Sequence, residues 1–482
     1  MRSRIRRRRH LGLMLPAMRI DERTLIAKGA AAAITQQGAA LPAEFTPHQY
    51  VIFLLHIAAE LEHVLMVEYL YAGFSLGGPR VPVERQAEVA QWQEIILGIG
   101  KEEMGHLMTI QNLLRCLGGP LNLDREDYPW DSEFYPFPFR LEPLTRGALA
   151  KYIFAESPAP EEWTGNEADE IRALAQEGVG SIELHRVGEL YSLIKALLED
   201  HDALKDSDFR SSTYPFQANW DEWGRGYQRG ARGNAMGGAM AGTPDMILMP
   251  VTCRSDAIEA IKAVATQGEA NPTGDEEIPS HFARFLRIYR QFPKDGSWSP
   301  SRNVPVDPIV MTKPTDNEDS QGSEGSFITH PEGRLWAQLF NVRYRTLLTG
   351  LLHTFDYSSN ISESSQMTPR GLLVHSTFGE MYNLRAISHI LVQTPLAADG
   401  SDRVAGPPFQ MPYTLNLPFD RADRWRLHLD LLQASRMLVD RLLVLNQNGH
   451  RKYLLALGRT DDETISTIET ILTGNPIPSS MR

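Results

Sequence analysis

The chain has 482 residues, 42% of them hydrophobic, and its formal net charge is −12. This length is sufficient for a large buried core and predicts two packed units, and the acidic balance argues against nucleic acid as a partner because phosphate binding needs a basic face. The two cysteines are too few for a disulfide framework, and no run of about 18 apolar residues is present, so we expect a cytoplasmic protein that does not bind membranes.

Residues 1–45 are interpreted as a basic tail and lead-in. Six arginines lie within the first nine positions, and the apolar stretch LGLMLPAM follows them, which faintly resembles a twin-arginine export signal. The apolar stretch is short, contains Pro16 and ends at Arg19 without a small-residue cleavage site. A disordered tail, or a later start at Met14 or Met18, is the alternative, and the tail therefore takes no part in the fold prediction.

The rest of the chain reads as two groups of helices. The first predicted helix runs from His48 to about Leu76, where two glycines and a proline end it. Further helices are predicted over 83–117, 167–198, 255–268 and 279–291, with an ordered aromatic loop over 120–143 and a short buried strand or extended piece at 246–252. These elements place a helical bundle at 46–295, a Pro- and Ser-rich linker or loop at 296–330, and a C-terminal helical domain at 331–482.

Polar residues interrupt the apolar stripes of several predicted helices. In helix 83–117, Glu103 and His106 share a face with Ile99 and Ile110, and in helix 48–76 Glu62 is the single charge on its stripe. Burying an unpaired carboxylate costs several kcal/mol, so each of these groups should have a strong partner. A metal ion is one such partner.

The last two helices of the bundle offer similar positions. Glu269 follows the apolar stripe of helix 255–268, and His281 shares a face with Phe285 and Ile288. Helix 167–198 offers Glu189, although Glu183 lies on a cleaner stripe and competes with it. Glu68, in the first helix, also has apolar neighbours and could pair with an arginine or line a substrate cavity.

Four antiparallel helices with inward carboxylates and two histidines are typical of a dinuclear metal site, because bridging carboxylates and terminal imidazoles suit iron or manganese. Glu103 and His106 supply one pair at the i and i+3 spacing, whereas Glu269 and His281 depart from it, being separated by a break that contains Pro272. The predicted ligands of two metal ions, iron first and manganese as the alternative, are Glu62, Glu103, His106, Glu189, Glu269 and His281.

A family resemblance supports this interpretation. The segments LEHVLMVEYLYAGFSL, KEEMGHLMTIQNLLRCLGGP, VGELYSLIKAL and MPVTCRSDAIEAIKAVATQGEA, followed by SHFARFLRIYRQF, resemble the ferritin-like domain of the iminophenylpyruvate dimer synthase family over residues 46–295. The resemblance implies an all-α fold in which a ferritin-like four-helix bundle precedes the second helical domain. It also implies a place in secondary metabolism, since the family is named after enzymes that couple oxidised aromatic amino acids.

The favoured function is a non-haem di-iron-type oxidoreductase that uses dioxygen or peroxide on a small substrate, with amino-acid-derived compounds among the candidates. A metal-storage bundle without organic turnover and a metal-independent imine-coupling enzyme remain open. The loop at 128–139 is either a wall of the substrate pocket or hydrophobic cover. His353, His375, Glu380 and His389 of the second half show no ligand spacing, so core or surface roles are favoured for them. Homo-oligomerisation is also left open.

Overall fold

The computed structural model describes residues 45–129, 135–219, 223, 247–268, 279–294, 296–310, 326–359, 368–412, 415–445 and 449–474. The predicted basic tail and Glu269 lie outside these residues. In the described residues almost all regular structure is helical, and the two strands, β1 (Ile309–Val310) and β2 (Phe327–Ile328), form one short parallel pair. The predicted all-α fold is confirmed.

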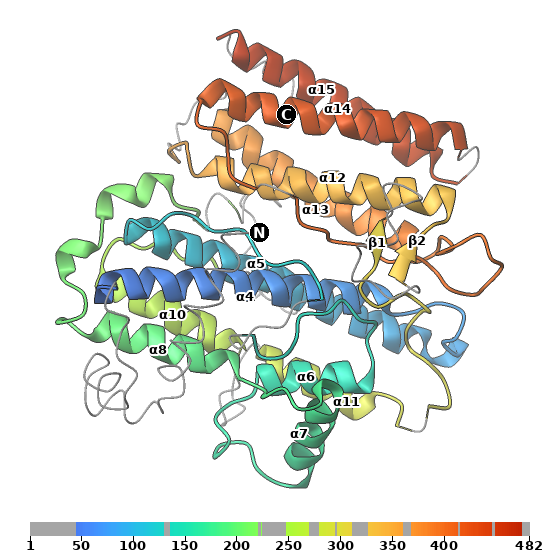
Figure 1. Ribbon diagram of the computed structural model, residues 1–482, viewed down its shortest axis with the longest axis horizontal. Coiled ribbons are helices and arrows are strands. Elements are labelled where there is room, and N and C mark those ends of the chain that lie inside the picture. Colours follow the sequence, from blue (N-terminus) through green and yellow to red (C-terminus); the bar gives the residue numbers. More distant parts are fainter. Residues whose placement is uncertain are drawn as a thin grey trace.

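Two long helices, α4 (Pro47–Ser75) and α5 (Gln86–Cys116), form the centre of the first half and pack along each other (Figure 1). Thr46 and Gln49 cap the start of α4 reciprocally, which satisfies backbone donors that the first turn leaves free. The helices approach closely at Gly100, where an added Cβ would lie 3.0 Å from the Leu70 side chain. By length and composition α4 could span a membrane, but 78% of that apolar window is buried inside the protein, as expected of a core helix.

Four shorter helices cover this pair in two halves. One half is α8 (Val187–Glu199) with α10 (Arg254–Gly268), and the other is α6 (Arg146–Ala155) with α11 (His281–Gln291) (Figure 1). The third and fourth helix positions of the bundle are therefore each filled by two shorter helices. Helix ends meet near the middle of α4 and α5, and backbone and side-chain groups at those ends face the interior there.

The structure corrects the prediction in three places. The helix expected over 167–198 is broken at Gly180, whose φ of +69° suits glycine, into α7 (Asn166–Val179) and α8. Helix α6 was not predicted, because its ten residues are too few for a clear period. Of the strand or extended piece expected at 246–252, the described residues, 247–252, form no strand.

The second half contains α12 (Pro331–Thr354), α13 (Pro369–Leu391), α14 (Arg421–Leu445) and α15 (Arg451–Leu472), which lie over α4 and α5 (Figure 1). One continuous apolar cluster runs from α4 and α5 into α12 and α13. Polar contacts cross the same boundary: His63 of α4 is hydrogen-bonded to the Tyr344 hydroxyl of α12, and Arg125 donates to the carbonyl of Phe409. The two predicted units therefore share a core.

Candidate metal centre

The centre of the bundle holds four of the predicted residues together. We call Glu62, Glu103, His106 and His281 the site cluster. Glu62 lies midway along α4, Glu103 and His106 lie one turn apart on α5, and His281 begins α11. None is more than 2% exposed. The ligand atoms of Glu103, His106 and His281 all lie within 4.8 Å of one another.

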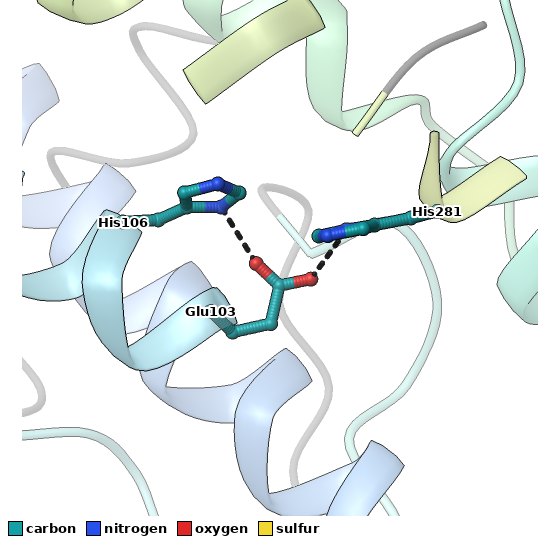
Figure 2. Close-up of side chains that lie close together, drawn as sticks. All are labelled: Glu103, His106 and His281. Atoms are coloured by element: carbon teal, nitrogen blue, oxygen red, sulfur yellow. Dashed lines mark hydrogen bonds and ion pairs between the residues drawn. The ribbon is translucent and has the colours of Figure 1, made fainter. Parts of the chain in front are cut away.

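Glu103 occupies the middle of the cluster, with one carboxylate oxygen toward each imidazole (Figure 2). Its Oε2 is 2.8 Å from Nδ1 of His106, and its Oε1 is 3.0 Å from Nδ1 of His281. Glu62 approaches the same His106 nitrogen at 3.3 Å. This arrangement follows from helix geometry, because residues i and i+3 share a face and α4 lies against that face.

The electrostatics of the cluster are those of carboxylates balanced by protons. Burial, reinforced by the charge of Glu103, raises the pKa of Glu62 to about 7. Burial alone would lower the pKa of His106, but the two neighbouring carboxylates raise it to about 10. Burial would likewise raise the pKa of Glu103, yet the charges of His281 and His106 hold it well below its usual value. The imidazolium protons thus provide the positive charge that the carboxylates need.

Several buried groups that sequence reasoning missed hold this cluster in place. Glu102, 1% exposed, accepts a hydrogen bond from Nε2 of His281 at 2.9 Å and pairs with Arg284 at 3.0 Å. The Tyr191 hydroxyl donates to Glu62. Since the imidazole donates through Nε2, its Nδ1 is left facing Glu103.

Glu156 adds another carboxylate at the edge of the cluster. It is the C-cap of α6, is 2% exposed and accepts a 2.6 Å hydrogen bond from the Tyr69 hydroxyl. Its other oxygen lies 3.9 Å from Nδ1 of His281. No stripe pointed to Glu156, because it stands at the end of a short helix. The adjacent EE pair at Glu102 was the one visible signal for that residue.

The other predicted positions lie elsewhere. Glu189 is partly exposed and pairs with Arg186 at 3.3 Å, so the structure does not bring it to the cluster. Glu183 is exposed and precedes α8, which removes the helical stripe on which it was placed. Glu68 is buried and accepts a hydrogen bond from the backbone N–H of Arg140, not from an arginine side chain.

A metal fits the space between these side chains. Among the described residues, Oε2 of Glu62, Oε1 of Glu103 and Nδ1 of His281 are buried and make no hydrogen bond, only ion-pair contacts within the cluster. A cavity of about 10 Å³ is bordered by Glu62, Glu103, His106 and Glu156. A Cβ on Gly268, which also lines it, would lie 2.8 Å from the Glu156 carboxylate. Mixed carboxylate and imidazole donors of this kind suit first-row metals.

The aromatic loop packs away from the cavity. Tyr128 donates to the carbonyl of Pro308 at 2.7 Å, and Phe137 lies beside Tyr152 with ring centroids 5.9 Å apart. None of the described residues of 128–139 lines the cavity. The described residues of the loop, 128–129 and 135–139, thus serve as hydrophobic cover.

The four polar residues of the second half do not converge. His353 stacks on His428, Glu380 pairs with Arg343, and His375 is exposed. His389 lies edge-on to the ring of Phe74 in the bundle. Among the described residues they form no group that could hold a metal.

The helical bundle and its central carboxylate and imidazole groups define a ferritin-like protein class. Comparison with known families agrees: residues 55–290 match the family described as Ferritin-like. The resemblance found in the sequence is confirmed at this level.

Among curated proteins, the chain is similar to dichlorochromopyrrolate synthase of Lentzea aerocolonigenes. The two are 25% identical over 386 residues, which cover 73% of this chain and 35% of the relative. The chain thus spans about a third of the length of the relative that it matches. No solved structure matches the chain.

Proposed function

We propose that the protein is a ferritin-like oxidase or oxygenase with a dinuclear metal centre, iron before manganese, that acts on a small, amino-acid-derived metabolite. The observation that carries the proposal is the convergence of the site cluster in a dry interior, with ligand atoms lacking other partners. The ferritin-like match and the similarity to a synthase support the biosynthetic role.

The residues divide the work among themselves. The site cluster and Glu156 would hold the metal ions, and Glu103 presents its two oxygens to different histidines. Bound iron would supply redox chemistry with dioxygen or peroxide. Tyr191 and Tyr69 orient Glu62 and Glu156 through hydrogen bonds. Burial of all these groups keeps bulk water away from the reaction.

Metal analysis of the purified protein tests the proposal. We expect about two equivalents of iron per chain, and oxygen consumption that is lost in Glu103→Gln. Glu189→Gln is the matched control, because Glu189 was also among the ligands predicted from sequence but lies outside the cluster. Metal content that falls equally in both variants, or that is absent from the unmodified protein, would contradict a metal centre at this position.

A second candidate, a metal-binding bundle without organic turnover, is favoured by one observation. The cavity at the cluster has room for about one water molecule, which is enough for an ion or solvent but not for an amino-acid-sized molecule. Tight metal binding with oxygen reduction that no organic co-substrate stimulates would favour this candidate. Full turnover by the metal-free protein would instead favour acid and base chemistry by the cluster itself.

A further inference from the structure

A second, larger cavity lies in the C-terminal half, away from the site cluster. Helix α12 packs against α13 and α14, and α14 packs against α15. Side chains of all four helices line the space between α13 and α15, a cleft of about 950 Å³. A volume of this size is typical of sites for small organic molecules. We call it the C-terminal cleft.

One side of the C-terminal cleft is apolar. Five buried side chains form an apolar cluster separate from the main core, and all five line the cleft: Leu372, Leu373, Trp425, Leu432 and Ile468. Apolar surface left beside an open volume is stabilised when a ligand covers it, at about 25 cal/mol per Å². The cleft can therefore bind the apolar body of a ligand.

The lining of the cleft is also acidic. The cleft is lined by the carboxylates of Glu380, Asp461, Asp462 and Glu463, and no lysine or arginine is found in its lining among the described residues. Its two histidines are His375, which is exposed, and His428, whose pKa burial lowers to about 4, so that His428 is neutral near pH 7.

Glu380 and Asp461 share a single buried cation. Arg343 of α12 contacts Glu380 at 2.8 Å and also pairs with Asp461, and we call these three residues the arginine cluster. None of the three is more than 6% exposed. Asp461 also accepts a hydrogen bond from Ser435 at 2.9 Å. Burial raises the pKa of both the Glu380 and the Asp461 carboxyl, because one guanidinium does not fully compensate two buried carboxylates.

Threonine hydroxyls add hydrogen-bond acceptors. Thr346, Thr377 and Thr464 line the cleft, and each donates its proton to a backbone carbonyl one turn earlier in its own helix, at 2.8 to 2.9 Å. A hydroxyl whose proton is used in this way offers only its lone pairs to a ligand. The cleft thus presents acceptors and carboxylates, and among the described residues its lining contains no lysine or arginine. Arg343 and Arg436 pair with the carboxylates from outside the lining.

From this pattern we propose that the C-terminal cleft binds an organic ammonium ion: a protonated amine, placed toward Glu380 and Asp461, on an apolar body that covers Trp425 and the leucines. The proposal does not depend on the metal centre. A zwitterionic amino acid fits less well, because its carboxylate would face the acidic lining without a cation. A basic side chain of a protein partner would satisfy the same charge but not the apolar wall.

Calorimetric titration of the full-length protein with three matched probes tests the proposal. Phenethylamine should bind, phenylalanine should bind at least about tenfold more weakly, and phenylacetate should not bind measurably. No binding of phenethylamine up to millimolar concentration, or equal binding of phenylacetate, would overturn the proposal.

Variants place the bound amine. Asp461→Asn should weaken phenethylamine binding about tenfold, whereas Glu469→Gln, an exposed carboxylate of the same helix outside the cleft, should leave binding unchanged. Because Asp461→Asn disturbs the arginine cluster, Thr464→Trp provides a second test, since it places an indole in the cleft one turn from Asp461. Binding that survives Thr464→Trp undiminished would also overturn the proposal.

Discussion

The site cluster and the arginine cluster are two buried groups of carboxylates that balance their charge in different ways. In the site cluster the counter-charge comes from imidazoles, which can lose their protons when another cation arrives. In the arginine cluster it comes from a guanidinium, which stays protonated at any ordinary pH. The site cluster is therefore suited to exchange protons for a metal ion. The arginine cluster is suited to keep its own charges while a bound ligand supplies further positive charge.

The largest effect is expected when the arginine cluster is disrupted. Arg343→Met leaves two carboxylates buried without their counter-ion, and the free energy of unfolding should fall by about 3 to 5 kcal/mol. Urea unfolding followed by circular dichroism measures it. The triple variant Arg343→Met, Glu380→Gln, Asp461→Asn should regain most of the loss. A near-neutral Arg343→Met would mean that water already reaches these groups.

The next largest effect concerns the metal affinity of the site cluster. Glu102→Gln should lower metal affinity about 10- to 100-fold, because Glu102 fixes the orientation and tautomer of His281. Competition with a chelator measures the affinity. Glu94→Gln, an exposed carboxylate on the same helix, is the control. Equal affinities in the two variants would show that His281 needs no orienting partner.

Proton exchange predicts a pH dependence of metal binding. A metal must displace the protons of Glu62, with a pKa of about 7, and of His106, with a pKa of about 10. Affinity should therefore rise with pH, by about tenfold per unit for each displaced proton, and more steeply below pH 7 than above it. Chelator competition between pH 6 and 9 measures the slope. An affinity independent of pH would contradict balance by protons.

The stability of the metal-free protein should change in the opposite direction. The pKa of His106 is higher in the folded protein, about 10, than its ordinary value of 6.5. Its contribution to stability is complete below pH 6.5 and is lost as pH rises toward 10. The metal-loaded protein should lack this contribution of His106, and unfolding of both forms across this range compares them.

The smallest expected effect concerns a single hydrogen bond. Tyr191→Phe removes the phenol that donates to Glu62, and metal binding should weaken by about 0.5 to 1.5 kcal/mol. Tyr152→Phe is the matched control, because this buried tyrosine does not line the cavity at the cluster. Metal affinity measured for both variants should separate them, and a loss in Tyr152→Phe as large as in Tyr191→Phe would assign the effect to packing.

The sequence predicted most of the site cluster because its members interrupt apolar stripes on unbroken helices. Glu62, Glu103 and His106 lie on α4 and α5, where the 3.6-residue period holds over many turns. Prediction failed at Glu189, since the break at Gly180 ends the helix from which its face was counted. Helical spacing counted along one helix does not predict which way residues face in the next helix, beyond a break in the chain.

The groups that support the cluster could not be predicted for a different reason. From Glu102 to Leu114, α5 is buried on every side, so a stripe marks only one of several interior faces. Glu102 depends on Arg284, far away in sequence, and Glu156 stands at the end of a short helix. Tertiary packing determines such pairings, and the spacing of apolar residues within one helix does not predict contacts between distant segments.

The shared core between the two halves has a practical consequence for anyone who wishes to isolate the ferritin-like region. Truncation of the chain before α12 would expose the apolar surface of α4 and α5, and it would remove the Tyr344 hydroxyl to which the buried His63 is hydrogen-bonded. Such a fragment should aggregate during expression, so work on the metal centre calls for the entire polypeptide.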